Sequence, residues 1–321
     1  MLDLVSKRYW WFAISLLTIV PGLFFILTGN LRVGIDFSGG TLWEFTIPNG
    51  QQITAEQFGQ VVSEQGLEGS RAQLSLPDEQ GQVIATVRTP AVAADDPLRQ
   101  QVINAVTQAY PGAELTRFET VGSIVSAEST RNAVLAVAVA SLVILLYLTL
   151  AFRNAPHPFR YGVCAILAML HDLLVVLGAA AILGYLIGLE VDALFLTAIL
   201  TVISFSVHDT IVVFDRLREN LGHRRTGQSF EEIVNLSIVQ TLTRSLNTQL
   251  TTFLTLLALL LFGGATIRNF VLILLIGLLS GTYSSIFNAA QLLVVWENGW
   301  SKDWRRAFGR ERQRPTGQAT A

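Results

Sequence analysis

Long apolar segments separated by short polar connections dominate the chain. Six of these segments approach or exceed the roughly 20 residues that a helix needs to cross the hydrocarbon layer of a bilayer. They cover residues 10–28, 133–152, 161–187, 193–214, 246–262 and 270–296. No A-x-A cleavage pattern follows the first segment, so we expect it to remain as an anchor. The pattern predicts a polytopic α-helical membrane protein with six transmembrane helices.

A polar stretch of about residues 30–132 separates the first two apolar segments. Its residue pattern alternates between the period of strands and the period of helices. Strands are predicted at 41–47, 71–76, 82–88 and 113–121, with a turn at 77–81, and helices at 54–65 and 96–109, with Thr54 as an N-cap. The order βαββαβ is that of a split βαβ, ferredoxin-like arrangement. We therefore expect a small extracytoplasmic α+β domain.

The composition agrees with a bilayer protein and excludes several other classes. Hydrophobic residues make up 51% of the chain and charged residues only 14%, whereas soluble domains carry about a quarter charged residues. The formal net charge of -2 argues against nucleic acid as a partner. The single cysteine, Cys164, excludes a disulfide framework and a CxxC metal site within the chain. We expect no metal and no cofactor.

Basic residues mark one side of the membrane. They flank the first segment, the connection between the second and third, the connection between the fourth and fifth, and the end of the sixth. The positive-inside rule then places both termini in the cytoplasm. The predicted organisation is a cytoplasmic N-terminus and first helix (1–29), an extracytoplasmic domain (30–132), helices two to six with a cytoplasmic loop at 215–245 (133–300), and a basic cytoplasmic tail (301–321).

Ionisable residues interrupt the third and fourth apolar segments. His171 and Asp172 lie in the third segment, His208 and Asp209 in the fourth, and Asp215 at the cytoplasmic end of the fourth. A charge at bilayer depth costs roughly 2.5–3.5 kcal/mol on insertion scales, so each such residue suggests function. Neighbours on a helix are about 100° apart, so His208 and Asp209 cannot share one face. An unpaired carboxylate has no inexpensive structural role, which makes Asp209 the leading candidate.

The fifth and sixth segments each carry a polar stripe. The stripe residues are Thr241, Arg244, Thr248, Thr251 and Thr255 on the fifth, and Ser280, Ser284, Asn288 and Gln291 on the sixth. Their helical spacing suggests a hydrated seam in which a carboxylate binds and releases protons beside an arginine. The alternative is that the hydroxyls bond their own helix and that Arg244 only reaches the cytoplasmic interface.

The motifs resemble one known family along nearly the whole chain. Residues 206–220, SVHDTIVVFDRLREN, resemble the signature of SecF, the smaller membrane subunit of the SecD and SecF protein-export complex. Further matching motifs are GIDFSGG at 34–40, LHD at 170–172, QTLTR at 240–244, LFGG at 261–264 and GTYSSI at 281–286.

The resemblance implies an auxiliary of the Sec translocon, related to the RND exporters, in the bacterial inner membrane. Such proteins use the proton-motive force to promote late translocation and release of preproteins. It implies that Asp209 and Arg244 move protons with an aspartate of SecD. The other ionisable residues of the third and fourth segments, Asp172, His208, His171 and Asp215, are accessory candidates because of their position. The implied partners are SecD, the SecYEG channel, preproteins driven by SecA, subunits like YajC or YidC, and lipid, but no nucleic acid.

Two further expectations concern the glycines and the absence of enzyme motifs. Gly34, Gly39 and Gly40 follow the first membrane segment, and we interpret them as a flexible hinge to the outer domain. The sequence has no GxxxxGK[ST], HExxH or GxSxG motif, so we expect no enzymatic activity. Two alternative functions remain: a structural scaffold of the translocon without proton coupling, and an RND-type transporter of a small molecule or lipid.

Overall fold

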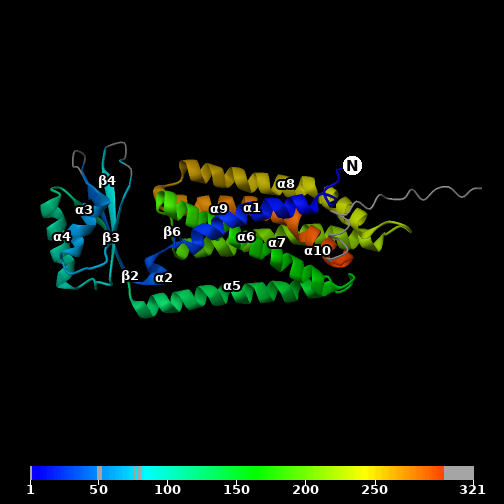
Figure 1. The fold of residues 1–321 in the computed structure, drawn as a ribbon, viewed down its shortest axis with the longest axis horizontal. Helices are drawn as coiled ribbons and strands as arrows, with labels where there is room; N and C mark the ends of the chain where they lie inside the picture. Colours follow the sequence, from blue (N-terminus) through cyan, green and yellow to red (C-terminus); the bar gives the residue numbers. More distant parts are fainter. Residues whose placement is uncertain (1, 49–52, 76, 78–80, 300–321) are drawn as a thin grey trace, which may run out of the picture. The chain divides into compact units, whose positions relative to one another are not determined.

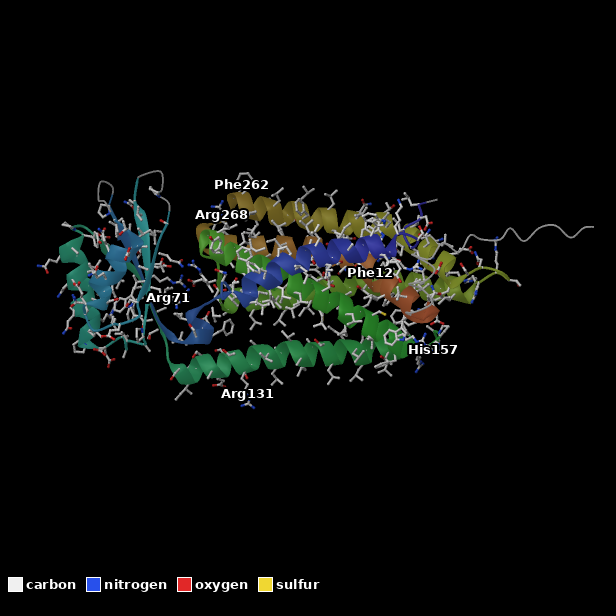
Figure 2. The ribbon with its side chains drawn as sticks, in the orientation of Figure 1. Phe12, Arg71, Arg131, His157, Phe262 and Arg268 are labelled. Atoms are coloured by element: carbon white, nitrogen blue, oxygen red, sulfur yellow. The ribbon has the colours of Figure 1, made fainter. Side chains whose placement is uncertain are left out.

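Six helices of the computed structural model are long and apolar enough to cross a membrane, as the sequence predicted. The structure describes residues 2–48, 53–75, 77 and 81–299. The helices, shown in Figure 1, are α1 (Arg8–Leu27), α5 (Ser123–Ala151), α6 (Pro158–Ile187), α7 (Ala193–Gly222), α8 (Phe230–Phe262), and a sixth formed by α9 (Ala265–Ser284), the π-helix η1 (Ser285–Ala289) and α10 (Ala290–Asn298). Large apolar side chains such as Leu250 are exposed along them, as expected against lipid. Figure 2 shows one of them, Phe262, at the end of α8.

Several helices continue beyond the apolar segments. A capping box starts α8 well before its apolar part: the Ser229 hydroxyl accepts from Glu232 N, and the Glu232 carboxylate accepts from Ser229 N. Since α7 runs to Gly222 and α8 begins at Phe230, the connection covers residues 223–229. The loop expected at 215–245 is therefore mostly helical. Hydrophobicity locates the hydrocarbon-crossing part of a helix and not its polar ends.

The α+β domain predicted at residues 30–132, here called the outer domain after its predicted location, has the predicted ferredoxin-like order. Its elements are β2 (Gly40–Ile47), α3 (Ala55–Ser63), β3 (Arg71–Leu74), β4 (Val83–Thr89), α4 (Pro97–Ala109) and β5 (Glu114–Val121). The sheet order is β3-β4-β2-β5 with every neighbouring pair antiparallel. Thr54 caps α3 by accepting from Gln57 N, and Asp96 caps α4 by accepting from Leu98 N. Within the turn predicted at 77–81, residues 78–80 lie outside the described residues.

One face of this sheet forms the core of the outer domain. Trp43, Phe45 and Val87 on the strands are fully buried, as are Phe58 on α3 and Val102 on α4. The alternating residues of β2 thus point toward α3 and α4, which cover that face. The alternation that predicted a strand at 41–47 thus corresponds to this buried face.

The chain divides into two compact units, and the connection between α6 and α7 belongs to the unit of the outer domain. In that connection β6 (Glu190–Val191) pairs in parallel with β1 (Arg32–Val33), just before the short helix α2 (Ile35–Ser38). Gly34 N donates to Val191 O over 2.8 Å. The sequence did not predict these elements, because strands of two residues leave no periodic pattern.

The predicted hinge glycines border α2. Gly39 and Gly40 have φ of 72° and 112°, and a Cβ at Gly40 would lie 2.6 Å from Thr89 O, so these positions require glycine. Gly34 is the N-cap of α2 in an extended conformation. The segment is therefore an ordered turn of helix with glycine-dependent geometry, and its role as a hinge stays a prediction.

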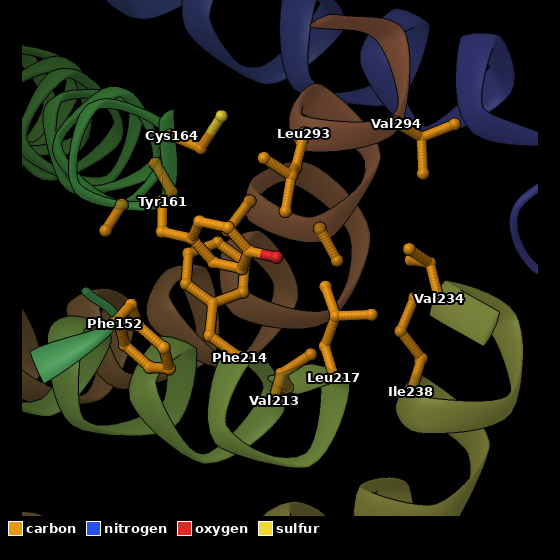
Figure 3. Close-up of a cluster of buried hydrophobic side chains, with 14 of the residues drawn as sticks. Phe152, Tyr161, Cys164, Val213, Phe214, Leu217, Val234, Ile238, Leu293 and Val294 are labelled. Atoms are coloured by element: carbon orange, nitrogen blue, oxygen red, sulfur yellow. The ribbon is translucent and has the colours of Figure 1, made fainter. Parts of the chain in front are cut away.

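The core of the helical unit lies toward the α7–α8 connection. Phe152, Tyr161 and Phe214 pack ring against ring, with centroids 5.3–6.1 Å apart (Figure 3). Leu217, Val234, Ile238 and Leu293 from α7, α8 and α10 complete this cluster, in which Cys164 is fully buried. This apolar packing joins the helices that carry the polar residues described next.

Candidate functional site

Asp172 of α6 is almost fully enclosed, with 1% exposure. Its Oδ2 accepts from Ser206 Oγ of α7 and Ser284 Oγ of α9, both over 2.6 Å. Its Oδ1 accepts from Ser280 Oγ over 2.6 Å and lies 3.0 Å from His171 Nδ1. These four neighbours occupy both carboxylate oxygens, whose capacity is about four hydrogen bonds. Asp172 thus ties three helices together.

Asp209 of α7 is nearly as buried, with 3% exposure, but its surroundings differ. Among the described residues it accepts one side-chain hydrogen bond, from Gln249 Nε2 of α8. The remaining acceptor positions of its two oxygens are unused by the described protein groups. The two buried aspartates therefore differ in one respect: Asp172 is saturated with donors, and Asp209 is not.

The polar stripe that we predicted on α8 is buried only at its first residue, toward the α7–α8 connection. Thr241 is buried, whereas Arg244, Thr248, Thr251 and Thr255 are exposed. The hydroxyls of Thr248, Thr251 and Thr255 each donate to the carbonyl four residues earlier, over 2.7–3.0 Å. For these threonines the self-bonded alternative is the correct one.

Arg244 does not meet Asp209. Its side chain is exposed, and its guanidinium makes no hydrogen bond or ion pair within the part of the chain that the structure describes. Because Asp209 points to the buried face of α8, where it meets Gln249, the two residues predicted to share proton movement lie on different sides of this helix.

The stripe of the sixth span is buried throughout. Ser280 and Ser284 contact Asp172, and Asn288 exchanges hydrogen bonds of 2.9–3.1 Å with Ser15 of α1. The next stripe residue, Gln291, is fully buried, and its amide has no partner among the described residues. The π-helix lies within this stripe, where Ser285 Oγ donates to Ser206 O over 3.1 Å. Such π-helices are often found at functional sites.

The remaining accessory candidates separate into two groups. His171 joins the Asp172 cluster. His208 is exposed on the face of α7 away from Asp209, as the 100° spacing required, and Asp215 is exposed and paired with Arg218 at 2.7 Å. Sequence reasoning missed Gln249 and Ser245. Polar residues at 237, 241, 245 and 249, spaced by four, were the signal that could have identified this face.

Comparisons with known proteins agree along the whole chain. The family model described as "Protein export membrane protein SecD/SecF, C-terminal" matches residues 101–299. The protein translocase subunit SecF of Thermobaculum terrenum is 48% identical over 97% of this chain and 98% of the relative. The chain belongs to the SecF family. The SecF of Anaerolinea thermophila is 45% identical, again over 97% of this chain and 98% of the relative.

Solved structures of related proteins have a similar fold. A crystal structure of a Thermus SecDF, described as a translocon-associated membrane protein, matches with a TM-score of 0.78 and 33% identity. The match covers 93% of this chain but 39% of the SecDF chain, so the chain spans less than half of that protein. A SecDF in a super-membrane-facing form matches with a TM-score of 0.63. The chain is thus a multi-pass membrane subunit of a protein translocase.

Proposed function

We propose that this chain works with SecD in the bacterial inner membrane and uses the proton-motive force to promote late translocation and release of preproteins. The SecDF of Bacillus subtilis supports this partnership, because the present chain matches 38% of that single polypeptide. The proposed topology has both termini in the cytoplasm and residues 30–132 outside, on the basis of the basic connections. The chain receives preproteins that SecA has driven through SecYEG, beside subunits such as YajC or YidC, and performs no covalent reaction.

The observation that carries this proposal is the environment of Asp209. A proton carrier must alternate between a protonated and an ionised carboxyl group, and Asp209 has unused hydrogen-bonding capacity in a buried position. Asp172 has no such capacity, because four neighbours already fill its oxygens. One proton crossing the membrane supplies about 2.3 kcal/mol per 100 mV.

The exposed position of Arg244 supports a role for SecD in the proton pathway. Arg244 lies directly before the apolar segment 246–262, and its guanidinium has no partner within the described chain, so it is available to a carboxylate of another subunit. We therefore propose that the face of α8 carrying Arg244, Thr248 and Thr251 meets SecD, and that a carboxylate of SecD completes the proton pathway there.

The test follows a preprotein already engaged in the channel, in vesicles that contain this chain, SecD and SecYEG. Asp209→Asn is expected to remove the part of export that depends on the proton gradient, because an amide cannot take up and release a proton. Glu219→Gln neutralises an exposed carboxylate of the same helix and is the matched control, which is expected to export like wild type.

The outcome separates the proposal from a scaffold role. If Asp209→Asn assembles with SecD and keeps gradient-dependent export, the chain is a structural scaffold of the translocon. The transporter alternative has no support among the relatives, which are named protein translocase subunits.

A further inference from the structure

A continuous line of polar side chains follows the buried face of α8 from Asp209 toward the α7–α8 connection. Its members, spaced four residues apart, are Gln249, Ser245, Thr241 and Ser237, with exposures of 7%, 2%, 7% and 0%. Residues at this spacing lie above one another on successive turns. The line begins at the hydrogen bond from Gln249 to Asp209.

Two atoms near the Asp209 end of this line lack hydrogen-bond partners in the described chain. Ser245 Oγ and Gln249 Oε1 are buried and make no hydrogen bond with any residue that the structure describes. A buried polar atom left unpaired costs about 1–3 kcal/mol, and such atoms are usually satisfied by buried water. The two residues lie one turn apart, and Gln249 contacts Asp209, which also has unused acceptor positions.

At its Ser237 end, the line reaches the polar ends of α7 and α8. Ser237 Oγ accepts from Asn220 Nδ2 of α7 over 2.8 Å. Asn220 also donates to Gln240 Oε1 over 2.9 Å, and this oxygen accepts from Arg216 Nε over 2.7 Å. Asn220 is half-buried, and Gln240 is exposed. The line thus connects the buried carboxyl group with side chains that solvent can reach.

We propose that water fills the gaps along this line and that the line is the route by which a proton leaves Asp209 on the side of the α7–α8 connection. This inference rests on the proposed function. It adds the outlet of the proton pathway, which lies on the cytoplasmic side in the proposed topology. The proton passes from the Asp209 carboxyl oxygen to an adjacent water, and each next water or hydroxyl takes one proton and releases another. Asp209 returns to the carboxylate form, and only O–H bonds break and form.

The other buried carboxylate has no unused acceptor position, although one buried atom of its cluster, His171 Nε2, also lacks a partner in the described chain. Asp172 is surrounded by donors from Ser206, Ser280 and Ser284, and none of these hydroxyls is left without a partner in the described chain. The outlet is therefore assigned to α8 and not to the contact between α6 and α9.

The experiment compares two buried thiols in the full complex with SecD. Cys164 is the only native cysteine and is fully buried in the apolar cluster, so it reports on a dry position. The second thiol is Ser245→Cys in a Cys164→Ala background, a nearly isosteric change. A small cationic methanethiosulfonate reagent is added to inverted vesicles, whose cytoplasmic face is outside. The Ser245→Cys thiol is expected to react at least about tenfold faster than Cys164, because the reactive thiolate forms where water reaches it.

The modified protein is then tested for gradient-dependent export, which is expected to be lost once the attached group blocks the line. Equal protection of both thiols overturns the proposal, and so does a modified protein that keeps gradient-dependent export. Co-purification with SecD shows that the variants assemble. The proposed function fails separately, through Asp209→Asn, whereas the thiol reactivity measures hydration whether or not protons move.

Discussion

The two buried aspartates are predicted to respond differently to replacement by asparagine. Asp172→Asn replaces a carboxylate that accepts from three serine hydroxyls with an amide whose N–H groups face those donors. Leaving buried donors unpaired costs about 1–3 kcal/mol, so we expect a lower unfolding temperature in detergent. Asp209→Asn, with one hydrogen bond at stake, is expected to lose coupling while keeping most of its stability.

The control for stability is Asp215→Asn. Asp215 is exposed, and its ion pair with Arg218 spans one turn of α7, so its loss should change stability by less than about 1 kcal/mol. An Asp172→Asn protein that unfolds at the wild-type temperature would contradict the structural role given to Asp172.

At the scale of residues, the sequence identified the groups but not their partners. Asp172 and Asp209 could be found because a carboxylate in an apolar run is costly wherever it points. The partners depend on helix rotation, which a polar pattern with two overlapping stripes does not determine. Arg244 and Thr241 were assigned to one stripe, yet one is exposed and the other buried.

At the scale of elements, the crossing of α1 and α6 depends on two glycines. A Cβ built on Gly178 would lie 2.7 Å from Gly22 Cα, and a Cβ on Gly22 would lie 2.6 Å from Gly178 Cα. Because backbone atoms cannot move aside, Gly178→Ala should destabilise the protein by about 1–3 kcal/mol, measured by thermal unfolding. Gly222→Ala is the matched control: no atom lies within 4 Å of its added Cβ, so we expect a neutral or slightly stabilising effect.

Long elements were predictable and short ones were not. The six spans and the βαββαβ order follow from periodicity that extends over many residues. The π-helix at Ser285–Ala289 and the pairing of β1 with β6 involve a few residues each, and they form because distant parts of the chain meet. Ser285, for example, bonds the backbone of α7 and not only its own helix.

At the scale of the whole molecule, the α6–α7 connection belongs to the same compact unit as the four-stranded sheet. Arg88 of β4 pairs with Glu190 of this connection and donates to Val33 O over 3.0 Å. Burial, together with the nearby charges of Arg32 and Arg71, lowers the pKa of Arg88 to about 10, so it remains charged at neutral pH. Its positive charge is compensated by Glu190, its ion-pair partner, and by the nearby carboxylate of Asp192.

Removing Glu190 alone should thus be worse than removing both partners. Glu190→Gln leaves a partly buried cation without its ion-pair partner, at a cost of about 1–3 kcal/mol. The double variant Arg88→Gln with Glu190→Gln removes that cation as well, so its unfolding temperature should recover toward wild type. Both variants, however, remove the ion pair between Arg88 and Glu190. If the α6–α7 connection transmits movement to the outer domain, both should slow gradient-dependent export to a similar extent. Export that recovers together with stability in the double variant would show that the pair only stabilises the domain.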